Sequence, residues 1–143
     1  MWAYLHGLWA FFVLIILIMA TGYHAAGLLK GRRYDMRTDF RLALFALVVT
    51  AIQLVLGVGA YLSSDYFRGI REGHMGEYMK NAHARLITVE HPTMAVLAFL
   101  LMLYGFRRMF YGIDPRRKFF SVLLFYGMAL LLILSRLPWS DWL

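Results

Sequence analysis

The chain has 143 residues, 62% of them hydrophobic, and a mean hydropathy of +0.62, well above the apolar content of an ordinary soluble domain. It contains no cysteine, which excludes disulfides, thiolate metal ligands, iron–sulfur clusters and covalently attached c-type haem. We interpret its net charge of +7 as a membrane-topology signal and expect no nucleic-acid partner.

Four stretches are long and apolar enough to cross a bilayer, which takes about 20 residues of α-helix. They are residues 2–29, 40–62, 84–106 and 119–137. We therefore predict an all-α membrane protein in which residues 1–143 form a single four-helix transmembrane domain. The spans leave no room for a soluble catalytic domain, so an electron carrier or an accessory subunit is expected rather than an independent enzyme.

The first span is predicted to be a retained helix and not a signal peptide, because its positive charges follow the apolar stretch instead of preceding it. His6 and His24 both lie in this span, about 27 Å apart along a helix axis. They therefore belong to opposite leaflets and cannot serve one site.

Two short connections carry most of the basic residues. Residues 30–41 contain five basic residues against two aspartates, and residues 107–118 contain five against one. By the positive-inside rule both connections are cytoplasmic. Both termini are therefore expected on the non-cytoplasmic side.

The second span contains Gln53, about 20 Å from the cytoplasmic edge of the helix and so in its outer half. It is followed by residues 63–82, a polar segment with several glycines. A loop of that length is as consistent with a functional segment as with a plain interfacial cap.

The third span contains Glu90, His91 and Pro92 in succession. Ionisable groups within a membrane helix are costly and usually face the interior of a bundle, where they find partners. Pro92 cannot donate a hydrogen bond to the carbonyl of Thr88, so it either kinks the helix or lies in its first turns. Both outcomes predict an irregular backbone beside His91.

Five polar residues from four different spans fall in the outer half of the bilayer, namely His6, Gln53, Glu90, His91 and Arg136. Helix bundles build cofactor and ion sites from such layers of inward-facing polar side chains. We therefore predict that these residues form one layer, with Gln53 as an interhelical hydrogen bonder.

His91 and His6 are candidate axial ligands of a b-type haem, because histidine pairs across a helix bundle suit this cofactor. The competing interpretation is that both are structural or interfacial histidines. Glu90 is predicted to pair with Arg136, the alternative being a proton-handling carboxylate beside a quinone or a haem propionate. His83 is expected at the interface, and the sequence shows no partner for His24 or His74.

Four short motifs, one in each span, can be compared with known families. They are Tyr4-Leu5-His6-Gly7-Leu8-Trp9, Gln53-Leu54-Val55-Leu56-Gly57, Thr88-Val89-Glu90-His91, and the segment from Phe125 to Trp139. Their order resembles small four-helix membrane proteins of Bacteroidota-type bacteria that are often labelled cytochrome b-like. The resemblance implies a haem-containing respiratory-chain context in a bacterial inner membrane, with His6 and His91 at histidine positions of the family. In the family pattern a histidine stands two residues before the glutamine, where this chain has Ala51.

Two functions are therefore expected from the sequence. The first is a cytochrome b-like electron carrier that binds haem b through His6 and His91, with Gln53, Glu90 and Arg136 tuning the iron or contacting the propionates. The second is a cofactor-free accessory subunit that packs against a larger respiratory membrane complex. Subunits of such a complex are the expected partners in either case, together with a quinone in the first.

Overall fold

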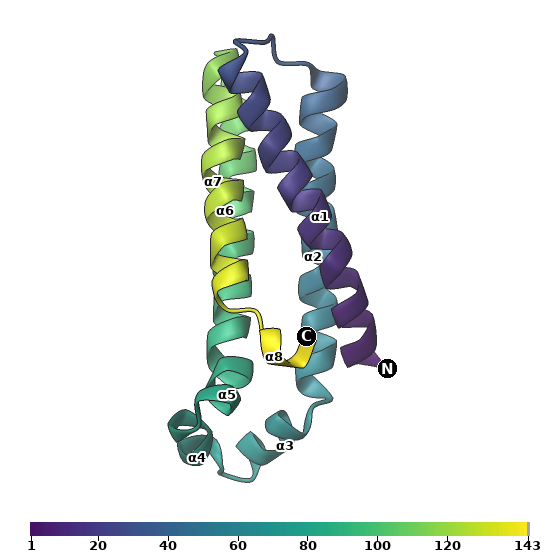
Figure 1. Ribbon diagram of the computed structural model, residues 1–143, viewed down its shortest axis with the longest axis vertical. Helices are drawn as coiled ribbons and strands as arrows, with labels where there is room; N and C mark the ends of the chain where they lie inside the picture. Colours follow the sequence, from purple (N-terminus) through teal and green to yellow (C-terminus); the bar gives the residue numbers. More distant parts are fainter. Residues whose placement is uncertain (143) are drawn as a thin grey trace.

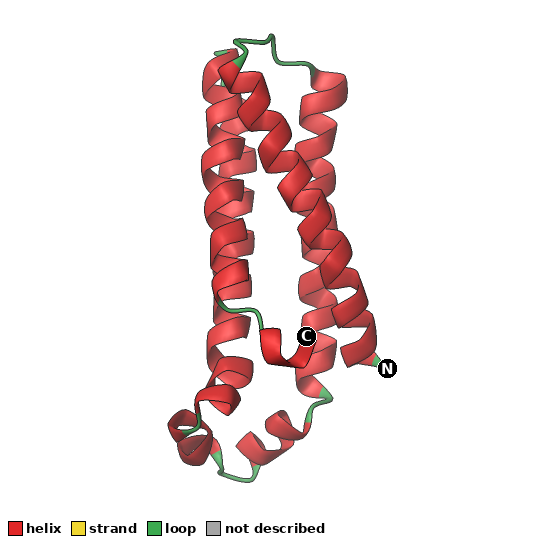
Figure 2. Ribbon diagram, in the orientation of Figure 1, coloured by secondary structure: helices red, strands yellow, loops and turns green. Residues whose placement is uncertain are grey.

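The computed structural model describes residues 1–142, and these residues form helices and short connections without any strand (Figure 1, Figure 2). Four long helices dominate the fold. In chain order the elements are α1 (Trp2–Leu29), the π-helical segment η1 (Met36–Phe40), α2 (Arg41–Leu62), α3 (Asp65–Arg71), α4 (Met75–Lys80), α5 (Ala82–Arg85), the π-helical segment η2 (Leu86–Glu90), α6 (His91–Tyr111), α7 (Pro115–Ser135) and α8 (Trp139–Trp142).

Four continuous helical stretches are long and apolar enough to span a membrane: Trp2–Leu29, Met36–Leu62, Ala82–Tyr111 and Pro115–Ser135. Large apolar side chains point outward along all four, among them Ile15, Val55, Leu100 and Leu131. A ring of exposed apolar side chains around a helical bundle is what a lipid environment requires. The predicted four-span, all-helical architecture is therefore confirmed.

The four long helices pack as a closed square. α1 packs against α2 and α7, and α6 packs against the same two helices. α1 consequently lies diagonally opposite α6, so residues of these two helices that point into the bundle face each other across its centre.

The two ends of the bundle differ in what they carry. One end, which we call the basic end, holds the connection from α1 to η1 and the connection from α6 to α7. The other end, which we call the terminal end, holds the N-terminus, α8 and the segment with α3, α4 and α5 (Figure 1). Both termini therefore lie at one end of the molecule.

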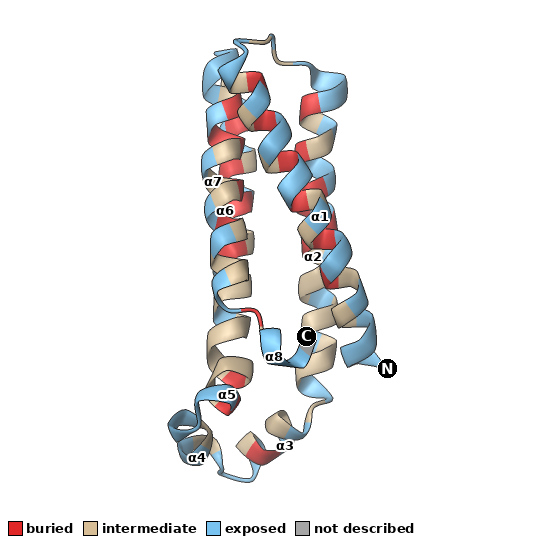
Figure 3. Cartoon of the chain, viewed as in Figure 1, coloured by how far each residue is buried: buried red, intermediate tan, exposed pale blue. Residues whose placement is uncertain are grey.

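The fully buried core is concentrated between the middle of the bundle and the basic end (Figure 3). It is centred on Tyr126, whose hydroxyl donates to the carbonyl of Ala43 at 2.8 Å. Its members are Leu17, Ala20, Ala43, Ala46, Leu47, Ala98, Met102, Met109, Val122, Tyr126 and Ala129. Toward the terminal end the side chains that face the interior are mostly half-buried.

The structure moves some predicted boundaries. The third helix continues from residue 106 to Tyr111 and ends at Gly112, which is extended. The fourth helix begins at Pro115 and ends at Ser135, two residues earlier than predicted, because the residue before Pro138 is disfavoured in helical conformation. The polar segment 63–82 is largely helical, because it contains α3 and α4. The side chain of Ser64 caps α3, and that of Asn81 caps α5 at the end of the segment.

Candidate functional site

His6 of α1 and His91 of α6 face each other across the diagonal of the bundle near the terminal end. Their ring centres are 6.1 Å apart and their planes meet at 79°. Both rings are partly buried. The two histidines that the sequence analysis placed in one layer are therefore neighbours, although they are 85 positions apart in the sequence.

The backbone before His91 is irregular, as Pro92 predicted. The five residues of η2 form a wide π-helical turn directly before His91, and the helix then continues through Pro92 into α6. Because Pro92 has no N–H, the carbonyl of Thr88 loses its usual partner. The hydroxyl of Tyr61 on α2 donates to that carbonyl at 3.1 Å and so replaces the missing hydrogen bond.

A main-chain carbonyl fixes the ring of His91. Its Nδ1 lies 2.9 Å from the carbonyl oxygen of Arg136, just beyond the end of α7. Since a carbonyl can only accept, Nδ1 carries the hydrogen and Nε2 carries the lone pair. Metal-binding histidines are oriented by the same kind of contact, so the Nε2 of His91 is set up to act as a ligand.

Gln53 of α2 holds the ring of His6. The Nε2 of Gln53 lies 3.1 Å from the Nδ1 of His6 and 3.2 Å from its carbonyl oxygen. The ring also lies against Gly57, where a Cβ atom would come within 3.0 Å of its Cε1. A glycine at this position on α2 therefore provides the space that the imidazole occupies.

The amide of Gln53 leaves one polar atom unsatisfied. Its Oε1 is buried and has no hydrogen-bond partner among the described residues. In this orientation the amide N–H donates to the Nδ1 of His6, so the hydrogen of the neutral ring is on Nε2. Rotating the amide would turn Oε1 toward Nδ1, move the hydrogen there and free the Nε2 of His6 as a ligand, but it would also break the hydrogen bond from the amide to the carbonyl oxygen of His6.

An ionic cluster lies next to the two histidines. Glu90 is paired at 3.4 Å with Arg136, which follows the last residue of α7, and this confirms the predicted Glu90–Arg136 pair. It is also paired with Arg85 at 2.8 Å, a partner that the sequence analysis missed. Residues five apart do not face each other on an α-helix, but the wider turn of η2 brings Arg85 and Glu90 to the same side.

The distance between the rings of His6 and His91 can be compared with that between two imidazoles on one metal ion. Two imidazoles bonded at about 2 Å to opposite sides of one ion have ring centres about 6 Å apart, close to the 6.1 Å seen between these rings. Among residues 1–142, no group of three or more histidine, cysteine, aspartate or glutamate side chains is placed to hold a metal ion.

The other histidines lie outside this layer. His24 is fully buried toward the basic end, where its Nδ1 bonds to the carbonyl of Ala20 and its ring contacts Phe119. His83 lies 3.6 Å from Asp141 at the terminal end, and both side chains are partly exposed. His74 lies on the short segment before α4, 3.9 Å from Glu72.

Ala51 does not point toward the layer. It precedes Gln53 by two residues, which places it about 200° around the axis of α2. A histidine at this position would face away from the side of α2 that carries the His6 contact. The arrangement of His6, Gln53 and His91 is therefore independent of the residue at position 51.

Comparison of the chain with protein-family profiles, with curated proteins and with solved structures finds no match. The description of this site therefore comes from its own residues: two facing histidines, the amide that holds one, the carbonyl that holds the other, and a three-residue ionic cluster beside them.

Proposed function

We propose that this protein is a cytochrome b-like membrane electron carrier that binds haem b between His6 and His91. The observation that carries the proposal is the separation of 6.1 Å between the two rings across the diagonal of the bundle. The hydrogen bond from the Nδ1 of His91 to the carbonyl of Arg136 adds support, because it leaves the lone pair of the neutral ring on Nε2.

Different residues would bind different parts of the haem. His91 is oriented by the backbone, whereas His6 depends on Gln53, whose amide must present its oxygen when His6 acts as a ligand. Arg85 and Arg136 supply positive charge beside Glu90 and suit the carboxylates of haem propionates. When bound, haem supplies one-electron redox chemistry, and the protein sets its potential through these neighbours.

The proposed setting is a bacterial inner membrane, with the basic end in the cytoplasm and both termini on the other side. The charge distribution of the two connections supports this orientation. The resemblance of the four motif segments to cytochrome b-like proteins of Bacteroidota-type bacteria supports a respiratory chain as the context. Subunits of a respiratory complex and a quinone are the proposed partners.

A second candidate function is a cofactor-free accessory subunit of such a complex. One observation favours it. In the present orientation of Gln53, the hydrogen of a neutral His6 is on Nε2, so this nitrogen has no lone pair with which to bind a metal ion. The polar layer would then stabilise the packing of the helices through interhelical hydrogen bonds.

Haem content separates the two functions. The protein is purified in a mild detergent, and its haem is counted per chain by extraction. About one haem b per chain is expected of the electron carrier. Chains without haem that co-purify with oxidase or quinol-oxidising subunits would reject the electron carrier in favour of the accessory subunit.

A further inference from the structure

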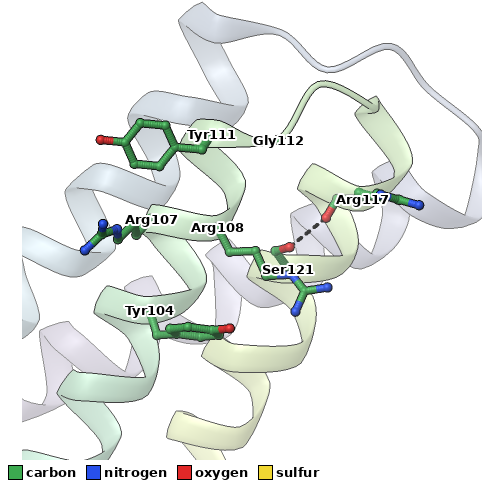
Figure 4. Close-up of a pocket in the computed structure, with 7 residues that line it drawn as sticks. All are labelled: Tyr104, Arg107, Arg108, Tyr111, Gly112, Arg117 and Ser121. Carbon is green, nitrogen blue, oxygen red and sulfur yellow. Dashed lines mark hydrogen bonds between the residues drawn. The ribbon is translucent and has the colours of Figure 1, made fainter.

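A groove between α6 and α7 at the basic end is unrelated to the histidine layer. It has a volume of about 340 Å³. Its walls carry Tyr104, Arg107, Arg108 and Tyr111 from α6, and Arg117 and Ser121 from α7. In Figure 4 the side chain of Arg108 extends between the two helices, while those of Arg107 and Arg117 point outward to opposite sides.

The three arginines of the groove are not neutralised. In the part of the chain that the structure describes, Arg107, Arg108 and Arg117 form no ion pair with a carboxylate. Asp114, the acidic residue of this connection, accepts instead from the backbone N–H of Arg116 and so caps α7. The groove therefore concentrates positive charge and suits an anion.

The groove lies where lipid headgroups lie. It is formed at the adjoining ends of two candidate spans, Ala82–Tyr111 and Pro115–Ser135. Tyr104 and Tyr111 are largely exposed, and tyrosine side chains favour the boundary between headgroups and hydrocarbon. Basic pockets between membrane helices at this depth bind anionic headgroups.

An exposed apolar surface continues from the groove toward the middle of the membrane. Leu100 and Leu97 precede Tyr104 by about one and two helical turns, and Leu124 and Met128 follow Ser121 by about one and two turns. All four side chains are exposed. A ligand with acyl chains can therefore place its phosphate among the arginines and its chains along this surface. Free phosphate can contact only the arginines.

We propose that the α6–α7 groove is a binding site for the headgroup of an anionic phospholipid. Guanidinium groups suit phosphate because their planar fork matches its oxygens, which favours a phosphate that carries net charge over a zwitterionic headgroup. The proposal does not depend on haem binding.

The test compares two lipids with the same acyl chains. Protein in a neutral detergent is titrated with dioleoyl phosphatidylglycerol or dioleoyl phosphatidylcholine, and bound lipids are counted by native mass spectrometry. We expect retention of phosphatidylglycerol to exceed that of phosphatidylcholine by about five-fold or more, given about a five-fold effect per basic residue at a charged surface. Excess inorganic phosphate is expected to displace little of the bound lipid.

Two variants locate the effect. Arg108→Gln/Arg117→Gln is expected to lower phosphatidylglycerol retention by about five-fold or more, and Arg108→Gln alone by less. The matched control is Arg33→Gln/Arg37→Gln, which removes the same charge from the basic end outside the groove. Equal retention of the two lipids, equal losses in both double variants, or full displacement by inorganic phosphate would overturn the proposal.

Discussion

The position of each imidazole depends on a different kind of neighbour. His91 is held by a main-chain carbonyl, so substituting the side chain of Arg136 leaves that hydrogen bond in place. His6 is held by the side chain of Gln53 and by the space above Gly57. Single substitutions of neighbouring side chains can therefore displace the ring of His6, but not the ring of His91.

Replacing Gly57 with valine is expected to push the ring of His6 out of place, because even a Cβ atom at position 57 would lie 3.0 Å from Cε1 of that ring. Overpacking of this kind costs about 1–3 kcal/mol in unfolding free energy. Haem content is expected to fall with it. Denaturant unfolding and haem extraction measure the two effects.

Gly22→Val is the matched control, since an added Cβ at Gly22 of the same bundle meets nothing within 4 Å. It should retain wild-type haem content. If the variants at positions 57 and 22 lost equal amounts of haem, the proposed packing of His6 against Gly57 would be wrong.

At the level of elements, two π-helical segments introduce the second and third spans. In η1, Asp39 is fully buried and accepts from both terminal nitrogens of Arg32 at 2.7 and 3.0 Å and from the backbone of Asp35. In η2, the wide turn aligns Glu90 with Arg85. Both segments therefore place a carboxylate where a regular helix would not.

Asp39→Asn is expected to destabilise the protein by about 2–4 kcal/mol, because it removes a charge that accepts three hydrogen bonds at a buried position. Asp65→Asn serves as the control, since Asp65 and its partner Arg68 are exposed, and such pairs contribute about 1 kcal/mol or less. Unfolding in denaturant measures both. Similar losses in the two variants would contradict the structural role of Asp39.

The hydrogen bond from Tyr61 to Thr88 compensates for Pro92. Tyr61→Phe is accordingly expected to cost about 0.5–1.5 kcal/mol in the wild-type background. In a Pro92→Ala background the cost should be smaller, because alanine supplies an N–H to the same carbonyl. A double-mutant cycle measures the difference, and an equal cost in both backgrounds would refute the compensation.

Apolar length and the residue types of the spans were sufficient to predict the four helices, the common layer of His6, Gln53, Glu90, His91 and Arg136, and the irregular backbone before Pro92. The pairing of Arg85 with Glu90 could not be predicted, because a regular helical period places these residues on different sides. Nor could the burial of Asp39, which depends on the fold of the connection before α2. Tertiary contacts decide these features, and no local pattern encodes them.

At the level of the whole molecule, packing and polarity are divided between the two ends. The buried core lies from the middle of the bundle to the basic end, and the histidine layer lies toward the terminal end (Figure 3). The buried core near the basic end stabilises the bundle, and the terminal end can therefore carry polar groups. The same division places the proposed haem and the proposed lipid headgroup in opposite leaflets.

The proposed orientation predicts the behaviour of reporter fusions. Alkaline phosphatase fused after Trp142 is expected to be active, and a green fluorescent protein fused at the same place is expected to be dark, because the first needs export and the second fails to mature after it. The same reporters inserted between Gly112 and Ile113 should behave in the opposite way. A fluorescent C-terminal fusion would place the C-terminus in the cytoplasm and so contradict the proposed topology.

The central claim is that His6 and His91 together hold one haem, and the reduced-minus-oxidised absorption spectrum of the purified protein tests it most directly. We expect a sharp reduced α band in the wild type and in His83→Ala, whose imidazole lies outside the layer. His6→Ala and His91→Ala should each lower that band by about ten-fold or more, since loss of one of two axial ligands removes most of the affinity for the metal. A wild-type protein without the band, or an undiminished band in either variant, would contradict the account.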